Sequence, residues 1–154
     1  QRASKISLLH QDPSKGTVGS LTVEENLELA IQKGSTSSLK SSLSQLASHP
    51  IMETFKQFFP NHSTLLKQET STLSGGQRQL LAAIIATAHR PDILLMDEPT
   101  AALSPAAAET LMNFVTSYRQ KHAVTVLVVT HATNLALHNF SAIWRVCDGN
   151  ISVA

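Results

Sequence analysis

Apolar residues gather in three short runs that predict the strands of a sheet. The runs are "ISLLH" at residues 6–10, "DILLM" at 92–96 and "VTVLVVT" at 124–130. The last two are almost continuously apolar, which is the pattern of strands buried on both faces. Near the end of the chain, residues 142–147 and 150–154 flank an Asp148-Gly149 pair, and this arrangement predicts a hairpin.

Residues that cap helices precede several segments in which apolar residues recur at helical spacing. The capping pairs are Thr22 with Glu25, Ser74 with Gln77, and Ser104 with Pro105. The helices that they begin should end near residues 32, 88 and 121. Leu39, Leu43 and Leu46 lie in a serine-rich stretch, which favours an amphipathic helix ending before Pro50 over a flexible linker. Further short helices are predicted for residues 51–59 and 132–139.

The order of these elements predicts an α/β fold. Strands that alternate with helices form a parallel sheet with right-handed crossovers, and the segment from about residue 32 to 71 predicts an all-helical subdomain. The 154 residues suit one domain or a large piece of one. A formal net charge of +1 gives no basic surface for nucleic acid, and the single cysteine, Cys147, excludes an internal disulfide. No apolar run reaches the roughly 20 residues of a membrane-spanning helix.

Two adjacent carboxylates follow the second apolar run. A strand from the sheet interior can place Asp97 where a Mg²⁺ ion bound to nucleotide phosphates would sit. Glu98 points elsewhere and could accept a proton from an attacking water. An isolated acid pair at a strand end is as often merely solvated, but the apolar strand before it and Pro99-Thr100 after it make this pair more specific.

The segment "LSGGQ", residues 73–77, combines a glycine turn with a helix start. Its glycines let the backbone approach a ligand closely, and the free N–H groups of the first helical turn attract an anion. The alternative is a plain capped helix. Two weaker candidates also end apolar strands, His131 as a hydrogen-bond donor to a γ-phosphate and Gln11 as a contact to a metal or water. A lone histidine or glutamine is more often structural.

Taken in order, these motifs resemble the nucleotide-binding subunits of ATP-binding-cassette (ABC) transporters. "LSGGQ" resembles the signature motif, "ILLMDEPT" the Walker B strand with the catalytic glutamate, "VVTH" the switch-histidine segment and "LLHQDP" the glutamine loop, which "LTVEEN" typically follows. The family's interface loop matches "AALS": Ala101, Ala102, Leu103 and Ser104. The resemblance covers nearly the whole chain and implies a P-loop NTPase core with an inserted α-helical subdomain.

The resemblance assigns roles to the candidate residues and implies ATP and Mg²⁺ as cofactors. Asp97 would hold Mg²⁺ through water, Glu98 would polarise the attacking water and His131 would contact the γ-phosphate. Gln11 would sense the metal and couple it to a membrane partner. The signature residues would hold the ATP of the opposite subunit: Ser74, Gly75, Gly76 and Gln77. Such subunits work as head-to-tail pairs with two ATP molecules at the interface.

The chain departs from the family pattern in three places. Ser104 stands where the family usually has aspartate; serine keeps the helix cap but loses the charge, and we expect altered coupling between the two sites. Leu80 stands where an arginine is usual. The phosphate-binding pattern G-x-x-x-x-G-K-[ST] is absent, since "SKGTVGSLT" has glycines at the wrong spacing.

The missing pattern suggests a C-terminal portion of such a subunit with an incomplete sheet. We divide this portion into a glutamine-loop end of the core (residues 1–20), a helical subdomain with the signature motif (21–89) and a core part (90–154). The last part would carry the Walker B strand, interface loop, switch histidine and hairpin.

The expected function is that of an ATP-binding and ATP-hydrolysing subunit of a membrane transporter, most similar to bacterial uptake systems. Its implied partners are a second nucleotide-binding subunit, transmembrane permease subunits and a substrate-binding protein, with no nucleic acid. These partners imply a cytoplasmic location on the inner face of the cell membrane. Two alternatives stay open: a non-catalytic remnant or interaction module, and a soluble ATPase built on the same cassette.

Overall fold

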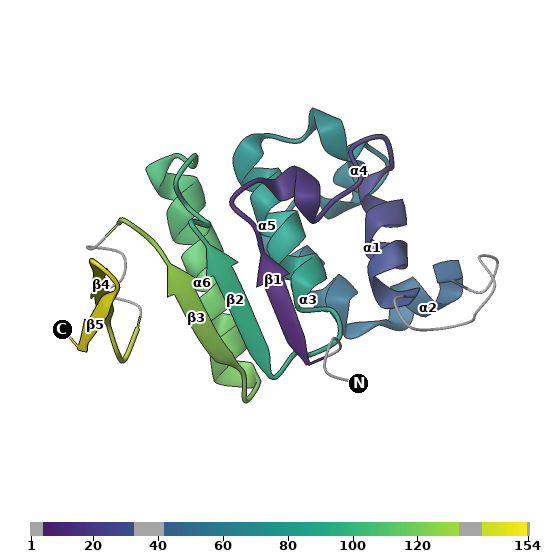
Figure 1. Cartoon of the computed structure of the whole chain (residues 1–154). Coiled ribbons are helices and arrows are strands. Elements are labelled where there is room, and N and C mark those ends of the chain that lie inside the picture. The colour runs from purple at the N-terminus through teal and green to yellow at the C-terminus, as the bar shows by residue number, and fades with distance from the viewer. Residues whose placement is uncertain (1–4, 33–41, 133–139, 154) are drawn as a thin grey trace.

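A three-stranded parallel sheet forms the centre of the molecule in the computed structural model, which describes residues 5–32, 42–132 and 140–153 (Figure 1). The strands are β1 (Ile6–Leu9), β2 (Ile93–Asp97) and β3 (Thr125–Val129), in the order β1-β2-β3. Leu8, Leu95 and Leu127 are paired across the sheet. The parallel sheet and its three strands confirm the prediction from the apolar runs.

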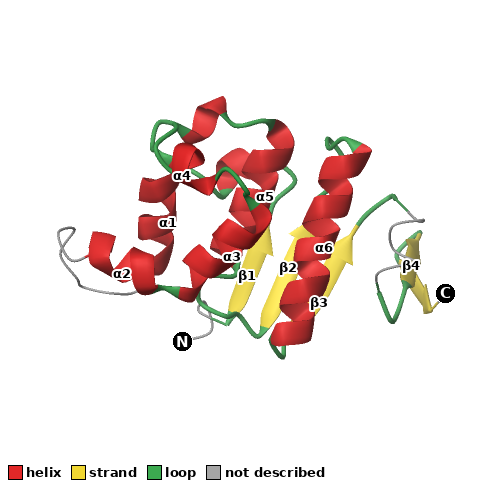
Figure 2. Ribbon diagram, turned by 180° about the vertical axis from the view of Figure 1, so that it is seen from behind, coloured by secondary structure: helices red, strands yellow, loops and turns green. Residues whose placement is uncertain are grey.

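The helices lie mainly on one side of this sheet. They are α1 (Val23–Gln32), α2 (Ser42–Ser48), α3 (Pro50–Phe58), α4 (His62–Leu65), α5 (Gly75–Ala86) and α6 (Pro105–Lys121), with 3-10 turns η1 (Pro13–Lys15) and η3 (Thr70–Thr72). Helices α5 and α6 cover one face of the sheet, and α1 to α4 gather beside β1 (Figure 2). This arrangement places α5 between the sheet and the other helices.

Most helix boundaries agree with the capping residues. Ser74 and Ser104 both act as N-caps, and Pro105 occupies the first turn of α6, as predicted. Helix α5 ends at Ala86, slightly earlier than expected, and Thr87 caps it. Residues 42–48 are helical, which favours a helix over a linker for that part of the serine-rich stretch. The predicted helix at residues 132–139 and the start of the serine-rich helix lie outside the described residues.

The prediction of burial on both faces, made for β2 and β3, is wrong: the residues of β3 are exposed or only half-buried, and Ile93 and Leu95 of β2 are half-buried. Leu94 and Met96 are buried where they face the helices. On the opposite face, Leu8 is 47% exposed and Val129 is 59% exposed, because α5 and α6 lie on one side only. A contiguous apolar surface therefore remains in contact with solvent, formed by Ile6, Leu8, Leu127 and Val129.

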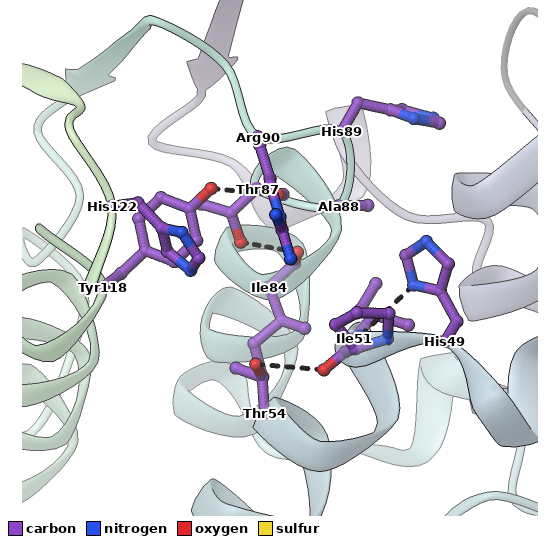
Figure 3. Close-up of a pocket in the computed structure, with 11 residues that line it drawn as sticks. His49, Ile51, Thr54, Ile84, Thr87, Ala88, His89, Arg90, Tyr118 and His122 are labelled. Carbon is purple, nitrogen blue, oxygen red and sulfur yellow. Dashed lines mark hydrogen bonds between the residues drawn. The ribbon is translucent and has the colours of Figure 1, made fainter.

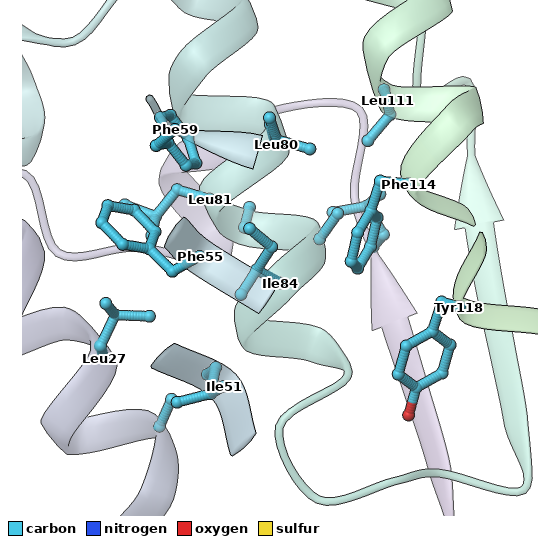
Figure 4. Packing of buried hydrophobic residues seen from close by; sticks show 14 of the residues in the cluster. Leu27, Ile51, Phe55, Phe59, Leu80, Leu81, Ile84, Leu111, Phe114 and Tyr118 are labelled. Atoms are coloured by element: carbon cyan, nitrogen blue, oxygen red, sulfur yellow. The ribbon is translucent and has the colours of Figure 1, made fainter. Parts of the chain in front are cut away.

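Helix α5 joins the sheet to the helical group, which consists of α1 to α4, through one continuous hydrophobic core (Figure 4). It contributes the buried side chains of Leu80, Leu81, Ala82, Ala83 and Ile84. Phe55 and Phe59 of the α3 segment stack with ring centroids 4.6 Å apart. Phe58 meets Phe114 of α6 edge to face at 5.4 Å, so α3 also contacts α6 directly.

The hairpin is formed by β4 (Trp144–Cys147) and β5 (Asn150–Val153). Its turn has positive φ at Asp148 (50°) and Gly149 (76°), which confirms the turn predicted from this pair. The strands pair Trp144 with Val153 and Val146 with Ile151, so these apolar side chains share one face. That face is exposed, and the hairpin lies apart from the parallel sheet (Figure 1).

A buried asparagine holds the start of α1 to the loop before it. Thr22 and Glu25 form the predicted capping box, with Thr22 N–H donating to Glu25 Oε2 at 2.7 Å. Asn26 accepts from Val18 N–H at 2.7 Å and donates to Val18 O at 3.0 Å and to Thr70 Oγ1 at 2.9 Å. One amide therefore joins the loop after η1 to the turn before α5.

The first turn of α5 packs closely against the first turn of α6. A Cβ atom added to Gly76 would lie 2.6 Å from the Cβ of Ala107, a distance that side chains do not adopt. At Gly75, an added Cβ would have no atom within 4 Å. Only the second glycine is therefore required for helix packing.

We expect Gly76→Ala to lower the free energy of unfolding by about 1–2 kcal/mol, because the added methyl group overpacks the contact with Ala107. Gly75→Ala is the matched control and should leave stability unchanged or raise it by up to about 1 kcal/mol, because alanine restricts the unfolded chain. Urea denaturation followed by circular dichroism measures both. Equal stability of the two variants would show that the contact with Ala107 imposes no constraint.

We expect Asn26→Ala to destabilise the chain by about 2–4 kcal/mol, because several buried polar groups lose their partner at once. Asn61→Ala is the control, since Asn61 is exposed at the start of α4 and its side chain makes no capping hydrogen bond. The same denaturation experiment compares the two. A loss below about 0.5 kcal/mol for Asn26→Ala would contradict the role given to its hydrogen bonds.

Candidate functional site

The candidate residues lie where the three parallel strands end. Leu9 pairs with Met96, and Asp97 pairs with Val129, so the next residues of each strand emerge at the same edge of the sheet. Ligands of open α/β sheets bind at this carboxyl edge. The structure therefore brings the ends of β1, β2 and β3 to one edge of the sheet.

Glu98 is held in a defined position at this edge. Its backbone has φ = 44°, a left-handed conformation that costs a non-glycine residue on the order of 1–3 kcal/mol. Its N–H donates to Val129 O at 2.9 Å, which extends the β2–β3 pairing by one bond. The Thr130 hydroxyl donates to Glu98 Oε2 at 3.3 Å and accepts from Ala132 N–H at 3.0 Å. Backbone and side chain of Glu98 are thus both fixed by the end of β3.

The second carboxylate oxygen of Glu98 faces His131. Oε1 lies 3.7 Å from His131 Nε2, and the side chains are 16% and 100% exposed, respectively. Oε1 is buried and has no hydrogen-bond partner in the part of the chain that the structure describes. A buried carboxylate oxygen without a donor retains its capacity to accept a hydrogen bond from a ligand or water.

Asp97 is exposed at the end of β2, next to Glu98. Among the described residues, no group of three or more His, Cys, Asp or Glu side chains could hold a metal ion. A Mg²⁺ ion at Asp97 would therefore need phosphate and water ligands as well, which is the usual coordination of Mg²⁺ in nucleotide sites. The donor set fits a nucleotide-bound ion rather than a closed protein cage.

The segment predicted as the glutamine loop begins directly after β1. Gln11 is exposed, and its side chain makes no hydrogen bond with Asp97 or Glu98 within the described part of the chain. Asp12 instead turns back into the loop and accepts from Ser14 N–H at 2.8 Å and from Ser14 Oγ at 2.7 Å. These hydrogen bonds from Ser14 hold the pKa of Asp12 below its usual value. Asp12 therefore shapes the loop, and Gln11 is left at its surface.

The capping box of α5 is complete. Gln77 N–H donates to Ser74 Oγ at 3.2 Å, and Ser74 N–H donates to Gln77 Oε1 at 3.0 Å. The two side chains are therefore engaged with each other's backbone. The N–H groups of Gly75 and Gly76 lie in the first turn, where no earlier carbonyl of the helix can accept from them. The anion-binding capacity of this segment thus resides mainly in its backbone.

The segment predicted as the interface loop leads from Glu98 to the start of α6, beside the predicted signature segment. Ala101 N–H donates to Glu98 O at 3.2 Å, and Ser104 then caps α6 by accepting from Ala107 N–H at 3.3 Å. Ala107 is the residue that contacts Gly76. Residues 101–104 therefore lead from the carboxyl edge of the sheet to the start of α6, which packs against the start of α5, and Ala101, Ala102 and Ser104 are exposed.

Three polar residues that the sequence reasoning did not single out organise this region. Thr130 orients Glu98, as described above. Gln79 is 1% exposed and donates from Nε2 to His10 O at 2.9 Å, while Arg78 Nε donates to Thr17 Oγ1 at 2.9 Å. The last two bonds tie the signature helix to the glutamine loop. The sequence signal for Gln79 is a polar residue at the start of the apolar stretch "LLAAIIA".

Comparisons with known proteins agree with these motifs. A family model described as ABC transporter matches residues 1–101. The chain is 35% identical over 137 residues to the tyrosine transport ATP-binding protein of Clostridioides difficile, covering 89% of this chain and 54% of the relative. It is 28% identical over 149 residues to a probable branched-chain amino acid transport ATP-binding protein of Archaeoglobus fulgidus, covering 97% and 59%. The chain thus spans little more than half the length of these curated relatives.

A solved structure confirms the predicted fold class. The cbiO1 protein of Clostridium perfringens, part of the ABC transporter complex cbiONQ, matches with a TM-score of 0.80 at 19% identity, over 97% of this chain and 56% of that protein. At this identity the likeness concerns the fold alone. Within the described residues, no helix is long and apolar enough to cross a membrane. Family model, relatives and fold agree, and this chain belongs to the ABC transporter family.

Proposed function

We propose that this chain forms part of the ATP-binding and ATP-hydrolysing subunit of an ABC-type uptake transporter. The observation that carries the proposal is the arrangement at the carboxyl edge of the sheet. There Glu98 is fixed by Thr130 and faces His131, and one of its oxygens is buried without a donor among the described residues. These are the features expected of a group that accepts a proton from water beside a transferred phosphate.

Glu98 is the candidate general base. Its Oε2 is held by the Thr130 hydroxyl, so Oε1 is the atom available to an attacking water. His131, beside Oε1 and fully exposed, could donate a hydrogen bond to a γ-phosphate oxygen. Asp97 and Gln11 would hold Mg²⁺ together with the phosphates and water, and the bound ion would supply positive charge to the phosphate oxygens.

The signature segment is proposed to act on a second subunit's nucleotide. Gly75 and Gly76 present backbone N–H groups at the start of α5, where the helix dipole favours phosphate. The exposed interface loop at residues 101–104 leads away from Glu98 and ends where α5 and α6 touch. This continuity supports a paired arrangement in which each interface carries parts of two sites. We infer a homodimer or a second nucleotide-binding subunit as the partner.

The relatives support an uptake system for amino-acid-like substrates. Their names refer to tyrosine transport, branched-chain amino acid transport and, for a relative from Oceanobacillus iheyensis, methionine import. By extension, we propose permease subunits and a substrate-binding protein as further partners. These partners would place the chain on the cytoplasmic face of the cell membrane.

A non-catalytic interaction module is the second candidate. The 154 residues contain no G-x-x-x-x-G-K-[ST] pattern, which supplies the main phosphate contacts of this class of enzyme. Such a module could still offer its signature segment to a complete partner. Turnover measurements separate the two proposals.

We expect the 154-residue chain by itself to show no ATP turnover, because these residues include no phosphate-binding loop to hold a nucleotide beside the carboxylates. A coupled assay of phosphate release measures this, with the Glu98→Gln variant of the same chain as the background. Turnover that disappears in Glu98→Gln would contradict the expectation and would show that these residues suffice for hydrolysis.

In a form of the protein that also carries a phosphate loop, we expect Glu98→Gln to bind ATP but to hydrolyse it about 10²–10⁴-fold more slowly, because the general base is lost. The variant should accumulate as an ATP-bound dimer in size-exclusion chromatography. Glu109→Gln is the control, since Glu109 lies exposed on α6 outside the site. Near-normal turnover of Glu98→Gln would exclude Glu98 as the base.

A further inference from the structure

A cavity lies away from the candidate site, where α3 begins and α5 and α6 end (Figure 3). Its volume is about 300 Å³, which is at the lower end of the range of small-molecule sites. Helices α5 and α6 both begin near the carboxyl edge of the sheet and run back along it. The cavity at their C-terminal ends therefore lies beside the opposite edge, where the strands begin. It is therefore separate from the candidate ATP site.

Cationic and hydrogen-bonding side chains line this cavity, and none of its lining residues is acidic. His49 comes from the start of α3, Arg90 from the turn after α5, and His122 from the end of α6. Figure 3 shows Arg90 between the two histidines. The guanidinium has no ion pair in the described part of the chain, and the acid that follows it in the sequence, Asp92, is paired with Lys5 at 3.0 Å.

The histidines sit in an environment that disfavours added positive charge. Burial, followed by the charges of His89 and Arg90, lowers the pKa of His49. Burial, followed by the charges of Arg90 and Lys121, lowers the pKa of His122. Burial would disfavour an anion as well, but the positive charge of Arg90, which contributes to both shifts, would attract one.

Two local features concern the side chains that could donate hydrogen bonds to an anion, His49 and Arg90. His49 Nδ1 accepts from Ile51 N–H at 3.2 Å, so in the neutral ring the proton is on Nε2, which can donate to a ligand. Arg90 has φ = 48°, a strained backbone conformation for a residue other than glycine. The strain sits at the residue whose forked guanidinium is best suited to bind a carboxylate or phosphate.

The base of the cavity is apolar. Ile51 and Ile84 are buried there, and the ring of Tyr118 lies 4.5 Å from that of His122 between centroids. The Tyr118 hydroxyl donates to Thr87 O at 3.2 Å, which satisfies it within the protein. The cavity thus combines an apolar and aromatic base with a rim that carries the Arg90 guanidinium and the imidazoles of His49 and His122.

We propose that this cavity binds a small organic anion, with its apolar body against Ile51 and Ile84 and its carboxylate or phosphate group on Arg90 and the two imidazoles. Such a ligand would contact α3 and α6 at the same time and join the helical group to the sheet layer. The site does not depend on ATP hydrolysis. Binding can therefore be tested on the 154-residue chain whatever the outcome of the turnover experiments.

Tyr118 is the only tyrosine of the chain, so 3-fluorotyrosine labelling places a single ¹⁹F signal inside the cavity. We expect a saturable shift of this signal on titration with benzoate or phenyl phosphate and none with neutral benzamide. A response to only one of the two anions would support the site and identify the oxyanion that it prefers. No saturable shift with either anion, or an equal response to benzamide, would overturn the proposal.

Arg90→Gln should weaken anion binding by about 10- to 100-fold, because one charged hydrogen-bonding group is lost. Arg119→Gln removes an equal charge from an exposed position on α6 outside the cavity, and it should bind as the unchanged chain does. The ¹⁹F spectrum without ligand verifies that each variant is folded. His122→Gln gives a second test from another helix. Unchanged affinity in both Arg90→Gln and His122→Gln would refute the site.

Discussion

The burial of α5 between the sheet and the helical group is the interaction on which the rest of this structure depends. Its side chains Leu81 and Ile84 are completely buried in the core that both layers share. Because α5 begins at the signature segment and ends beside the cationic cavity, its position determines both places. The Gly76–Ala107 contact fixes one end against α6, and Gln79 ties the same end to the start of the glutamine loop.

Local sequence signals predicted the parts of the fold that local interactions determine. The capping boxes at Thr22 and Ser74 and the turn at Asp148 involve groups a few residues apart, so the sequence alone identifies them. The exposure of Leu8 and Leu127 was not predictable in this way. A continuously apolar strand indicates that both faces of the sheet are covered, but among the described residues no second layer covers the face that carries Leu8 and Leu127. The division into residues 1–20, 21–89 and 90–154 stays a prediction.

In the candidate site, too, local sequence signals identify some of the residues, and the packed structure is needed for the others. Asp97, Glu98 and His131 follow apolar strands and could be found by their position alone. Thr130 and Gln79 could not, because their roles depend on partners 32 and 69 residues away in the chain. A hydroxyl beside a candidate histidine, or an amide beside an apolar helix segment, can form hydrogen bonds with many different partners. Only the packed structure shows which partner it has. The cavity beside Arg90 is likewise lined by residues from three separate parts of the chain.

The open face of the sheet has a consequence for the thermodynamics of unfolding. The heat capacity change of unfolding rises with the apolar area that becomes exposed, and the denaturant dependence rises with the total area. In the folded state, roughly half of the surface of each of four apolar residues is already in contact with water: Ile6, Leu8, Leu127 and Val129. The stability curve of this chain should therefore be flatter against temperature than that of a protein of the same length whose sheet is covered on both sides.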